Sequence, residues 1–149
     1  MAENVQQLLR ERAEDDSVGL KYGGRDWTWR EHLTEAATQA AALIGIADPD
    51  RPLHVGVLLG NTPDMLRAMA AAGLGGYVLC GINTTRRGDG ILADVRRSDC
   101  QILVTDAEHR RLLDGLDLGD VRLLDTSTAE WTDLLAAATT DVRSLTPHR

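Results

Sequence analysis

The sequence has 149 residues, a formal net charge of −7, 43% hydrophobic residues and 26% charged residues. This length suits one compact α/β domain, and the composition is that of an ordinary globular protein rather than a disordered or membrane one. The acidic balance argues against nucleic acid as the main partner. Because the sequence has no membrane-length apolar run and no signal-peptide pattern at its N-terminus, we expect a cytoplasmic protein.

The N-terminal third predicts a helix, a hairpin and a second helix. Residues 4–14 carry apolar side chains at helical spacing after a capping-box-like start at Asn4. The stretches SVGLKY and DWTWR alternate at period two around GGR, which predicts a β-hairpin. Residues 30–45 then place leucines and alanines on one stripe and end at a glycine, as a core-facing helix does.

From residue 54 onward, apolar runs alternate with helical patterns. HVGVLL, YVLCGI, QILVT and VRLLD are predicted strands, the first two buried on both faces, and the segments between them are predicted helices, including one over residues 107–116. Thr62, Pro63 and Asp64 predict a strong helix start, with the Thr62 hydroxyl as the cap. We expect an α/β fold with a mostly parallel open sheet, helices on its faces and an antiparallel hairpin. The domain spans residues 1–140, and residues 141–149 resemble the start of a connection.

A glycine-rich turn, AAGLGGYVLCGIN, raises the question of a phosphate-binding loop. Such a loop needs its glycines after a strand and at the start of a helix, so that backbone N–H groups face the phosphate. Here Gly73, Gly75 and Gly76 follow a helix and precede a strand. We therefore interpret them as a left-handed helix C-cap with close helix–sheet packing.

Two aspartates and two arginines are the remaining polar candidates. Asp106 and Asp125 each end an apolar strand, where acids can bind magnesium, but both also precede helices and we favour a role as N-caps. Arg86 and Arg87 stand just before a helix N-terminus, an unfavourable place for cations. They could face an anionic ligand, but the nearby Asp89 offers a simpler compensation.

Cysteine and histidine positions predict no metal centre. Cys80 and Cys100 lie in or next to apolar runs and are expected to be buried thiols. The histidines show no metal-type spacing: His32, His54, His109 and His148. We also find no Ser-His-Asp, Cys-His or paired-glutamate arrangement, so we assign no catalytic, cofactor-binding or metal-binding residue.

Four segments, in order, carry a resemblance to a known family. DWTWREHL at 26–33 has Thr28, Trp29 and Glu31 in a threonine-aromatic-x-glutamate-leucine pattern; the others are HVGVLLGNTPDML at 54–66, AAAGLGGYVLCGIN at 70–83 and ILADVRRSDCQILVTD at 91–106. They resemble the N-terminal part of adenylate-forming (AMP-binding) enzymes, in particular long- and very-long-chain fatty-acyl-CoA synthetases. The resemblance covers residues 17–106 well and the rest loosely. Cys80 and Gly81 replace the family's usual proline, which leaves the acyl-chain length open.

The resemblance implies a parent enzyme and an incomplete chain. In the family, ATP and a fatty acid give an acyl-adenylate, from which coenzyme A displaces AMP, so the parent would use ATP, Mg²⁺ and coenzyme A. The family's phosphate loop with its lysine, its magnesium-binding glutamate and its C-terminal catalytic lysine have no counterpart here, where Lys21 is the only lysine. We therefore expect an inactive N-terminal fragment of a fatty-acid-CoA ligase that binds no cofactor.

Two further expectations concern partners and an alternative function. A fragment would leave surface that is normally covered by the remainder of the parent enzyme, so we expect it to form a homodimer. The alternative is a complete flavodoxin-like or receiver-like α/β module that binds a ligand or partner at its strand ends. A complete module would cover both faces of its sheet, whereas a fragment would leave an apolar face or a strand edge bare.

Overall fold

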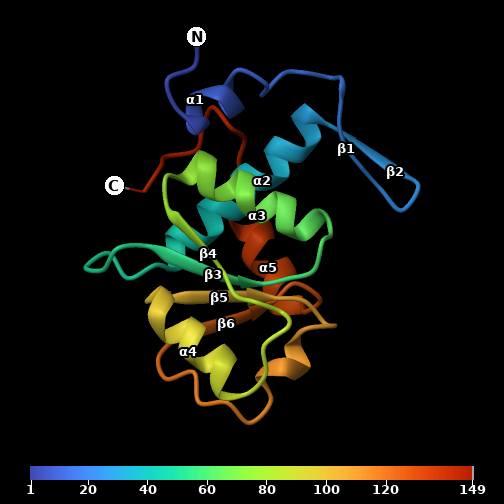
Figure 1. Ribbon diagram of the computed structural model, residues 1–149. Helices are drawn as coiled ribbons and strands as arrows, with labels where there is room; N and C mark the ends of the chain where they lie inside the picture. Colours follow the sequence, from blue (N-terminus) through green and yellow to red (C-terminus); the bar gives the residue numbers. More distant parts are fainter. Residues whose placement is uncertain (149) are drawn as a thin grey trace.

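The computed structural model describes residues 1–148 as an α/β fold with two sheets (Figure 1). In chain order the elements are α1 (Val5–Arg10), β1 (Val18–Tyr22), β2 (Arg25–Thr28), α2 (Trp29–Ile46), β3 (His54–Leu58), α3 (Pro63–Gly75), β4 (Val78–Gly81), α4 (Asp89–Ser98), β5 (Ile102–Thr105), the 3-10 helix η1 (Arg110–Leu113), β6 (Arg122–Asp125) and α5 (Ala129–Ala137). The predicted fold class is confirmed.

The hairpin and the helix that follows it are set by local sequence signals. β1 and β2 pair antiparallel, with Tyr22 opposite Arg25. Gly23 and Gly24 between them have φ values of 57° and 79°, the left-handed conformations that a two-residue hairpin turn requires. Thr28 then begins α2 at once, so the hairpin is attached directly to the longest helix of the domain.

The second sheet has four parallel strands in the order β4-β3-β5-β6. α2, α3 and α5 bury their apolar side chains on one face of this sheet, against Val55, Val57 and Val104. α4 and η1 cover the other face, where Ile91, Val95 and Leu113 pack with Leu58 and Leu103. Figure 1 shows this arrangement, with α2 and α3 above the strands and α4 below them.

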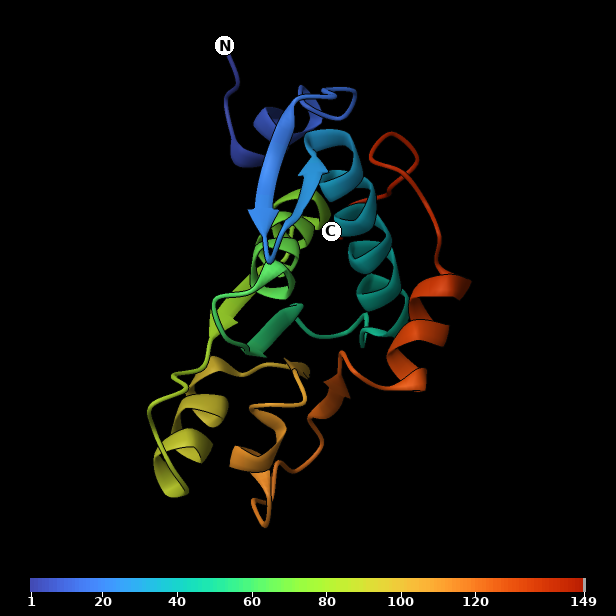
Figure 2. The same cartoon turned by 90° about the vertical axis from the view of Figure 1, so that its right-hand side faces the viewer.

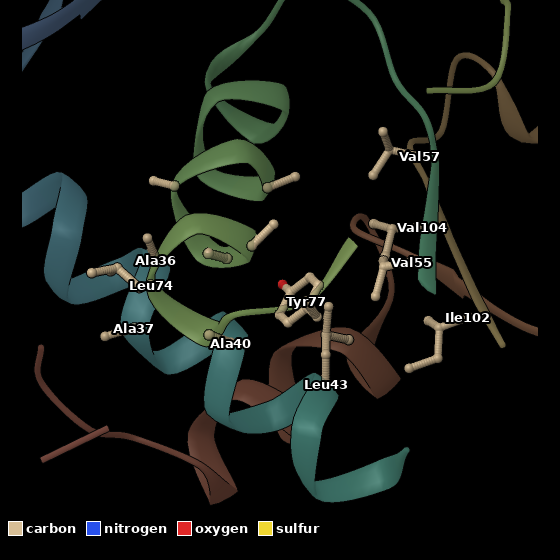
Figure 3. Close-up of a cluster of buried hydrophobic side chains, with 14 of the residues drawn as sticks. Ala36, Ala37, Ala40, Leu43, Val55, Val57, Leu74, Tyr77, Ile102 and Val104 are labelled. Carbon is tan, nitrogen blue, oxygen red and sulfur yellow. The ribbon is translucent and has the colours of Figure 1, made fainter. Parts of the chain in front are cut away.

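Small residues bring α2 and α3 close together above the sheet. Ala36, Ala37 and Ala40 of α2 are fully buried, as is Leu74 of α3. The Tyr77 ring fills the space between these helices and the strands (Figure 3). A Cβ at Gly75 would lie 2.8 Å from a carbon of this ring, so glycine there allows the tyrosine to enter the core.

Four local predictions need correction. α1 is shorter than predicted. Residues 107–116 form only the short 3-10 helix η1, because Asp106 and His109 tie the preceding residues into a turn. β4 is not buried on both faces, since it lies at the edge of the sheet. Thr62 does begin α3, but its hydroxyl makes no capping hydrogen bond.

Residues 141–148 return along α2 to the end of α3 (Figure 2). Val142 and Leu145 are 4% and 6% exposed, and they belong to the main core. The N–H of His148 donates a hydrogen bond to the carbonyl of Gly75 at 2.7 Å. Among residues 1–148, no helix combines the length and apolar character that crossing a membrane requires.

Candidate functional site

The strongest candidate site lies between the carboxyl ends of β3 and β5. Residues 59–62 lead from β3 to α3 on one face of the sheet, whereas the chain after β5 leads to η1 on the opposite face. Two adjacent parallel strands whose connections diverge in this way form a topological switch point, the place where open α/β sheets bind ligands. We call this region the switch crevice; it comprises Gly60, Asn61, Asp106 and His109.

Asp106 and His109 form a tight pair in the switch crevice. One carboxylate oxygen of Asp106 accepts a hydrogen bond from the backbone N–H of His109 at 2.8 Å and lies 2.7 Å from the Nδ1 atom of its ring. The second oxygen accepts from the N–H of Gly60 at 3.4 Å. The two side chains are 16% and 14% exposed. An ionised Asp106 can accept a hydrogen bond from Nδ1 of the His109 ring. Nε2 is then the ring nitrogen that does not face the carboxylate.

The environment of Asp106 favours its ionised form. Burial raises the pKa of this carboxyl, but the hydrogen bonds from His109 and Gly60 outweigh burial and hold the pKa below its usual range. Glycine at position 60 is part of the arrangement, because a Cβ there would lie 3.2 Å from the Cε1 atom of His109. The pair therefore joins the loop after β3 to the loop after β5.

A second polar network lies beside the switch crevice and is fully paired. Arg67 of α3 contacts Glu35 of α2 at 2.8 Å and Asp64 at 2.9 Å. The other carboxylate oxygen of Asp64 accepts a hydrogen bond from the hydroxyl of Thr126, after β6, at 3.0 Å. Since these charges satisfy one another, we assign the network a structural role: it ties α2, α3 and the end of β6 together.

The two aspartates singled out in the sequence do not form a joint cation site. Asp106 binds its own turn and Gly60, as described above. Asp125 accepts hydrogen bonds from the backbone N–H and the hydroxyl of Ser127, at 2.9 and 2.6 Å. It is not the N-cap of α5, because Thr128 takes that position. Residues 1–148 contain no group of three or more side chains arranged to hold a metal ion.

The two arginines before α4 are engaged within the chain. Arg86 pairs with Asp94 at 3.3 Å, and Arg87 donates to the carbonyls of Thr84 and Arg86 at 2.8 and 2.7 Å. Asp94, one and a half turns into α4, therefore offsets the charge of Arg86 in place of the expected Asp89. These contacts support a structural role for Arg86 and Arg87 rather than contact with an anionic ligand.

The glycine-rich turn is the helix end that the sequence indicates. Gly76 is the C-cap of α3, with a left-handed φ of 71°. The turn lies before β4, at the amino end of the sheet, opposite the switch crevice. Phosphate binding there has no support from the geometry.

The cysteines and the other histidines take positions in the fold without joining a site. Cys100 is buried, whereas Cys80 is only partly buried, and burial raises the pKa of the Cys80 thiol. His32 is buried beside Trp29, and burial first and then Arg67 lower its pKa. His54 meets the carbonyl of Ser98 through Nδ1 at 2.9 Å. Among the histidines, His109 alone faces another titratable side chain of residues 1–148 at hydrogen-bond distance, a pairing that the Asp-x-x-His spacing after β5 could have indicated.

The parallel sheet, the opposed helix layers and the switch crevice together define an open α/β domain of the kind that carries ligands at its strand ends. The chain belongs to the AMP-binding enzyme family, whose model matches residues 8–147. The predicted family resemblance is thereby confirmed.

Three relatives with stated activities are similar to this chain in sequence. The chain is 40% identical, over 89% of its length, to steroid-22-oyl-CoA synthetase of Rhodococcus jostii. It is 38% identical to the medium/long-chain-fatty-acid-CoA ligase FadD17 of Mycobacterium marinum and 37% identical to that of Mycobacterium tuberculosis, again over 89% of its length. It spans only 24%, 25% and 26% of these three relatives.

Solved structures share the fold. A fatty acyl CoA synthetase of Mycobacterium tuberculosis superposes with a TM-score of 0.78 at 19% identity, covering 96% of this chain and 30% of its own. The N-terminal domain of FACL13 from the same organism also gives 0.78, at 20% identity, and covers 96% of this chain. This chain spans 38% of that domain and 37% of the NpsA N-terminal subdomain of Klebsiella oxytoca, which it matches with a TM-score of 0.74 at 17% identity.

Proposed function

We propose that this chain is the N-terminal part of a fatty-acid-CoA ligase and supplies part of its structural framework. In the proposed parent reaction, ATP and a fatty carboxylate give acyl-adenylate and pyrophosphate, and the thiol of coenzyme A then displaces AMP. The observation that carries the proposal is the 37–40% identity, over 89% of the chain, to relatives whose names state acyl-CoA synthesis. The parent would use ATP, Mg²⁺ and coenzyme A, in the cytoplasm.

We also propose that residues 1–149 do not catalyse this reaction alone. A nucleoside triphosphate needs cationic groups or backbone N–H donors. Here Asp106 follows β5, Asp125 ends β6, and Asp64 lies in the first turn of α3. Arg67 of α3, a partly buried cation, is held by Glu35 and Asp64. Lys21, the only lysine, lies on the exposed hairpin, 3.5 Å from Asp26. The three carboxylates repel phosphate groups, and the two cations are already paired with carboxylates.

A chimera tests the role in the parent enzyme. In it, this chain replaces the matching segment of the M. tuberculosis FadD17 relative. Fatty-acid-dependent pyrophosphate exchange by the chimera is the expected result, with the unaltered relative as the positive control. A chimera that unfolds cooperatively but produces no exchange with any medium- or long-chain fatty acid would contradict the proposed function.

The isolated chain tests the second proposal and the alternative. Calorimetry with Mg-ATP and pyrophosphate exchange with fatty acids should both give signals no larger than buffer. Turnover by the isolated chain would contradict the inactivity proposal. Saturable binding of a nucleotide without turnover would instead favour an independent ligand-binding module, which the switch crevice could then serve.

A further inference from the structure

We propose that the outer side of α3, together with the groove where it meets the hairpin, is the surface on which the rest of the ligase polypeptide docks. We call it the α3 face and define it by five exposed apolar residues: Val5, Leu8, Tyr22, Leu66 and Met69. This inference rests on the proposed function, since it assigns a place to the part of the enzyme that lies outside this chain.

The first support is the sequence of α3 itself. Apart from Asp64 and Arg67, which pair with each other, α3 has no charged side chain, and from Ala68 to its end it consists of alanine, methionine, glycine and leucine. A helix that is apolar on every side is typical of a position buried all round. Its inner side meets this expectation, because Ala71 and Leu74 are fully buried.

The outer side of α3 does not meet the expectation of burial on every side. Leu66 is 43% exposed and Met69 is 55% exposed, at positions three residues apart on one stripe of the helix. A covered helix would place both side chains in contact with protein. An exposed stripe of this kind, continuous with other apolar residues, marks an interaction surface rather than scattered surface leucines.

Neighbouring elements extend the stripe at both ends of α3. At its N-terminal end, Tyr22 and Leu20 of the hairpin line a groove of about 360 Å³ together with Leu66. At its C-terminal end, a Cβ at Gly73 would lie 3.1 Å from a methyl carbon of Val5, so α1 packs directly on α3 there. Figure 1 shows the hairpin and α1 at opposite ends of α3.

Two comparisons of chain length favour the rest of the ligase polypeptide as the part that covers the α3 face. The chain spans 24–26% of its relatives, and it spans only 38% and 37% of two structures that are themselves an N-terminal domain and an N-terminal subdomain. Most of such a domain is therefore additional polypeptide that must fold against a segment like this one. The α3 face offers apolar area for that contact, with Lys21 and Asp26 at its polar border. A second copy of the chain is the competing occupant.

The oxidation of Met69 provides a readout independent of activity. Dilute hydrogen peroxide converts an exposed methionine to its sulfoxide, and mass spectrometry measures the rate at each methionine. We expect Met69 to be oxidised about tenfold more slowly in the FadD17 chimera than in the isolated chain, because burial excludes the oxidant. In the isolated chain, the fully exposed Met1 gives the oxidation rate of an unprotected methionine. In the chimera, added free methionine gives this reference rate.

The outcomes separate the two proposals. Protection of Met69 in a chimera without exchange activity supports docking and counts against the ligase function alone. Equal oxidation in the chimera and the isolated chain overturns the docking proposal, whatever the activity. Protection in the isolated chain that grows with protein concentration assigns the α3 face to a second copy and also overturns the proposal.

Charged substitutions keep the inference testable if the chimera does not fold. In the isolated chain, Leu66→Lys and Met69→Lys should each reduce binding of an apolar fluorescent dye about twofold or more, because the charge interrupts the patch. Val78→Lys is the matched control: Val78 is 49% exposed but lies on β4, outside the α3 face. Equal dye binding by all three variants and the unsubstituted chain would contradict the α3 face as a continuous apolar surface.

Discussion

Thr28 and Glu31 cap the N-terminus of α2 reciprocally. The Thr28 hydroxyl accepts a hydrogen bond from the Glu31 N–H at 3.1 Å, and the Glu31 carboxylate accepts one from the Thr28 N–H at 2.8 Å. The threonine-aromatic-x-glutamate pattern in DWTWREHL therefore has a physical function: it ends the hairpin and begins the helix in a single step.

Removal of this cap should destabilise the protein. We expect Thr28→Ala to lower the free energy of unfolding by about 1 kcal/mol, the typical cost of an N-cap. Denaturant titration measures it. Thr62→Ala is the matched control, because the Thr62 hydroxyl is buried and has no hydrogen-bond partner among residues 1–148. A loss at Thr62 as large as that at Thr28 would show that Thr62 does cap α3.

Two glycines in helices should respond in opposite directions to the same substitution. Gly75→Ala places a Cβ 2.8 Å from the Tyr77 ring and 3.2 Å from the Cβ of Ala40. We expect it to cost about 1–3 kcal/mol, as overpacking does. Gly45→Ala, in α2, meets nothing within 4 Å and should stabilise the protein by about 0.5–1 kcal/mol through helix propensity. Thermal unfolding of the two variants compares them, and a tolerated Gly75→Ala would mean that α3 can move away from Tyr77.

The Tyr77 hydroxyl is a buried polar group with no hydrogen-bond partner in the described part of the chain, residues 1–148. Burial raises the pKa of Tyr77 above its usual value, so the phenol stays protonated at all ordinary pH values. Because no hydrogen bond is lost, Tyr77→Phe should leave the free energy of unfolding unchanged or raise it by up to about 1 kcal/mol. Urea titration at neutral pH measures the change, and a loss of more than that amount would reveal a hydrogen-bond partner such as a buried water.

The Asp106–His109 pair should make stability depend on acid pH. The folded-state pKa of Asp106 is lowered from its unfolded value of about 4. Its stabilising contribution is therefore fully present above pH of about 4 and is lost as the pH falls through the lower folded-state pKa. Asp106→Asn should lower stability at pH 7 and show a smaller further loss between pH of about 5 and 2.

Urea titrations at several pH values test this linkage. Asp16→Asn is a useful comparison, since hydrogen bonds from Arg30 lower the pKa of Asp16 but this carboxyl is fully exposed and should contribute little. If the unsubstituted chain and Asp106→Asn lost stability in parallel as the pH falls, the Asp106 carboxylate would make no pH-dependent contribution to stability, contrary to this prediction.

Local signals in the sequence were sufficient for most of the framework. Gly23 and Gly24 determine the hairpin turn because few other residues adopt positive φ, and Gly76 ends α3 for the same reason. Continuous apolar runs identify β3 and β5 because strands at the centre of a parallel sheet are covered on both faces. The family motifs lie within these same segments, so the resemblance and the periodicity gave one consistent fold.

Tertiary structure decided what local signals could not. The position of β4 at the edge of the sheet depends on strand order, which the apolar run YVLCGI does not contain. Residues 107–116 have a helical pattern, yet the pairing of Asp106 with His109 across from Gly60 replaces most of that helix with a turn. Likewise, the packing of the fold decides that the Thr62 hydroxyl has no hydrogen-bond partner among residues 1–148 and that the outer side of α3 is exposed. Chain-local chemistry sets turns, caps and strand cores, whereas strand order and packing decide which side chains meet and which surfaces stay open.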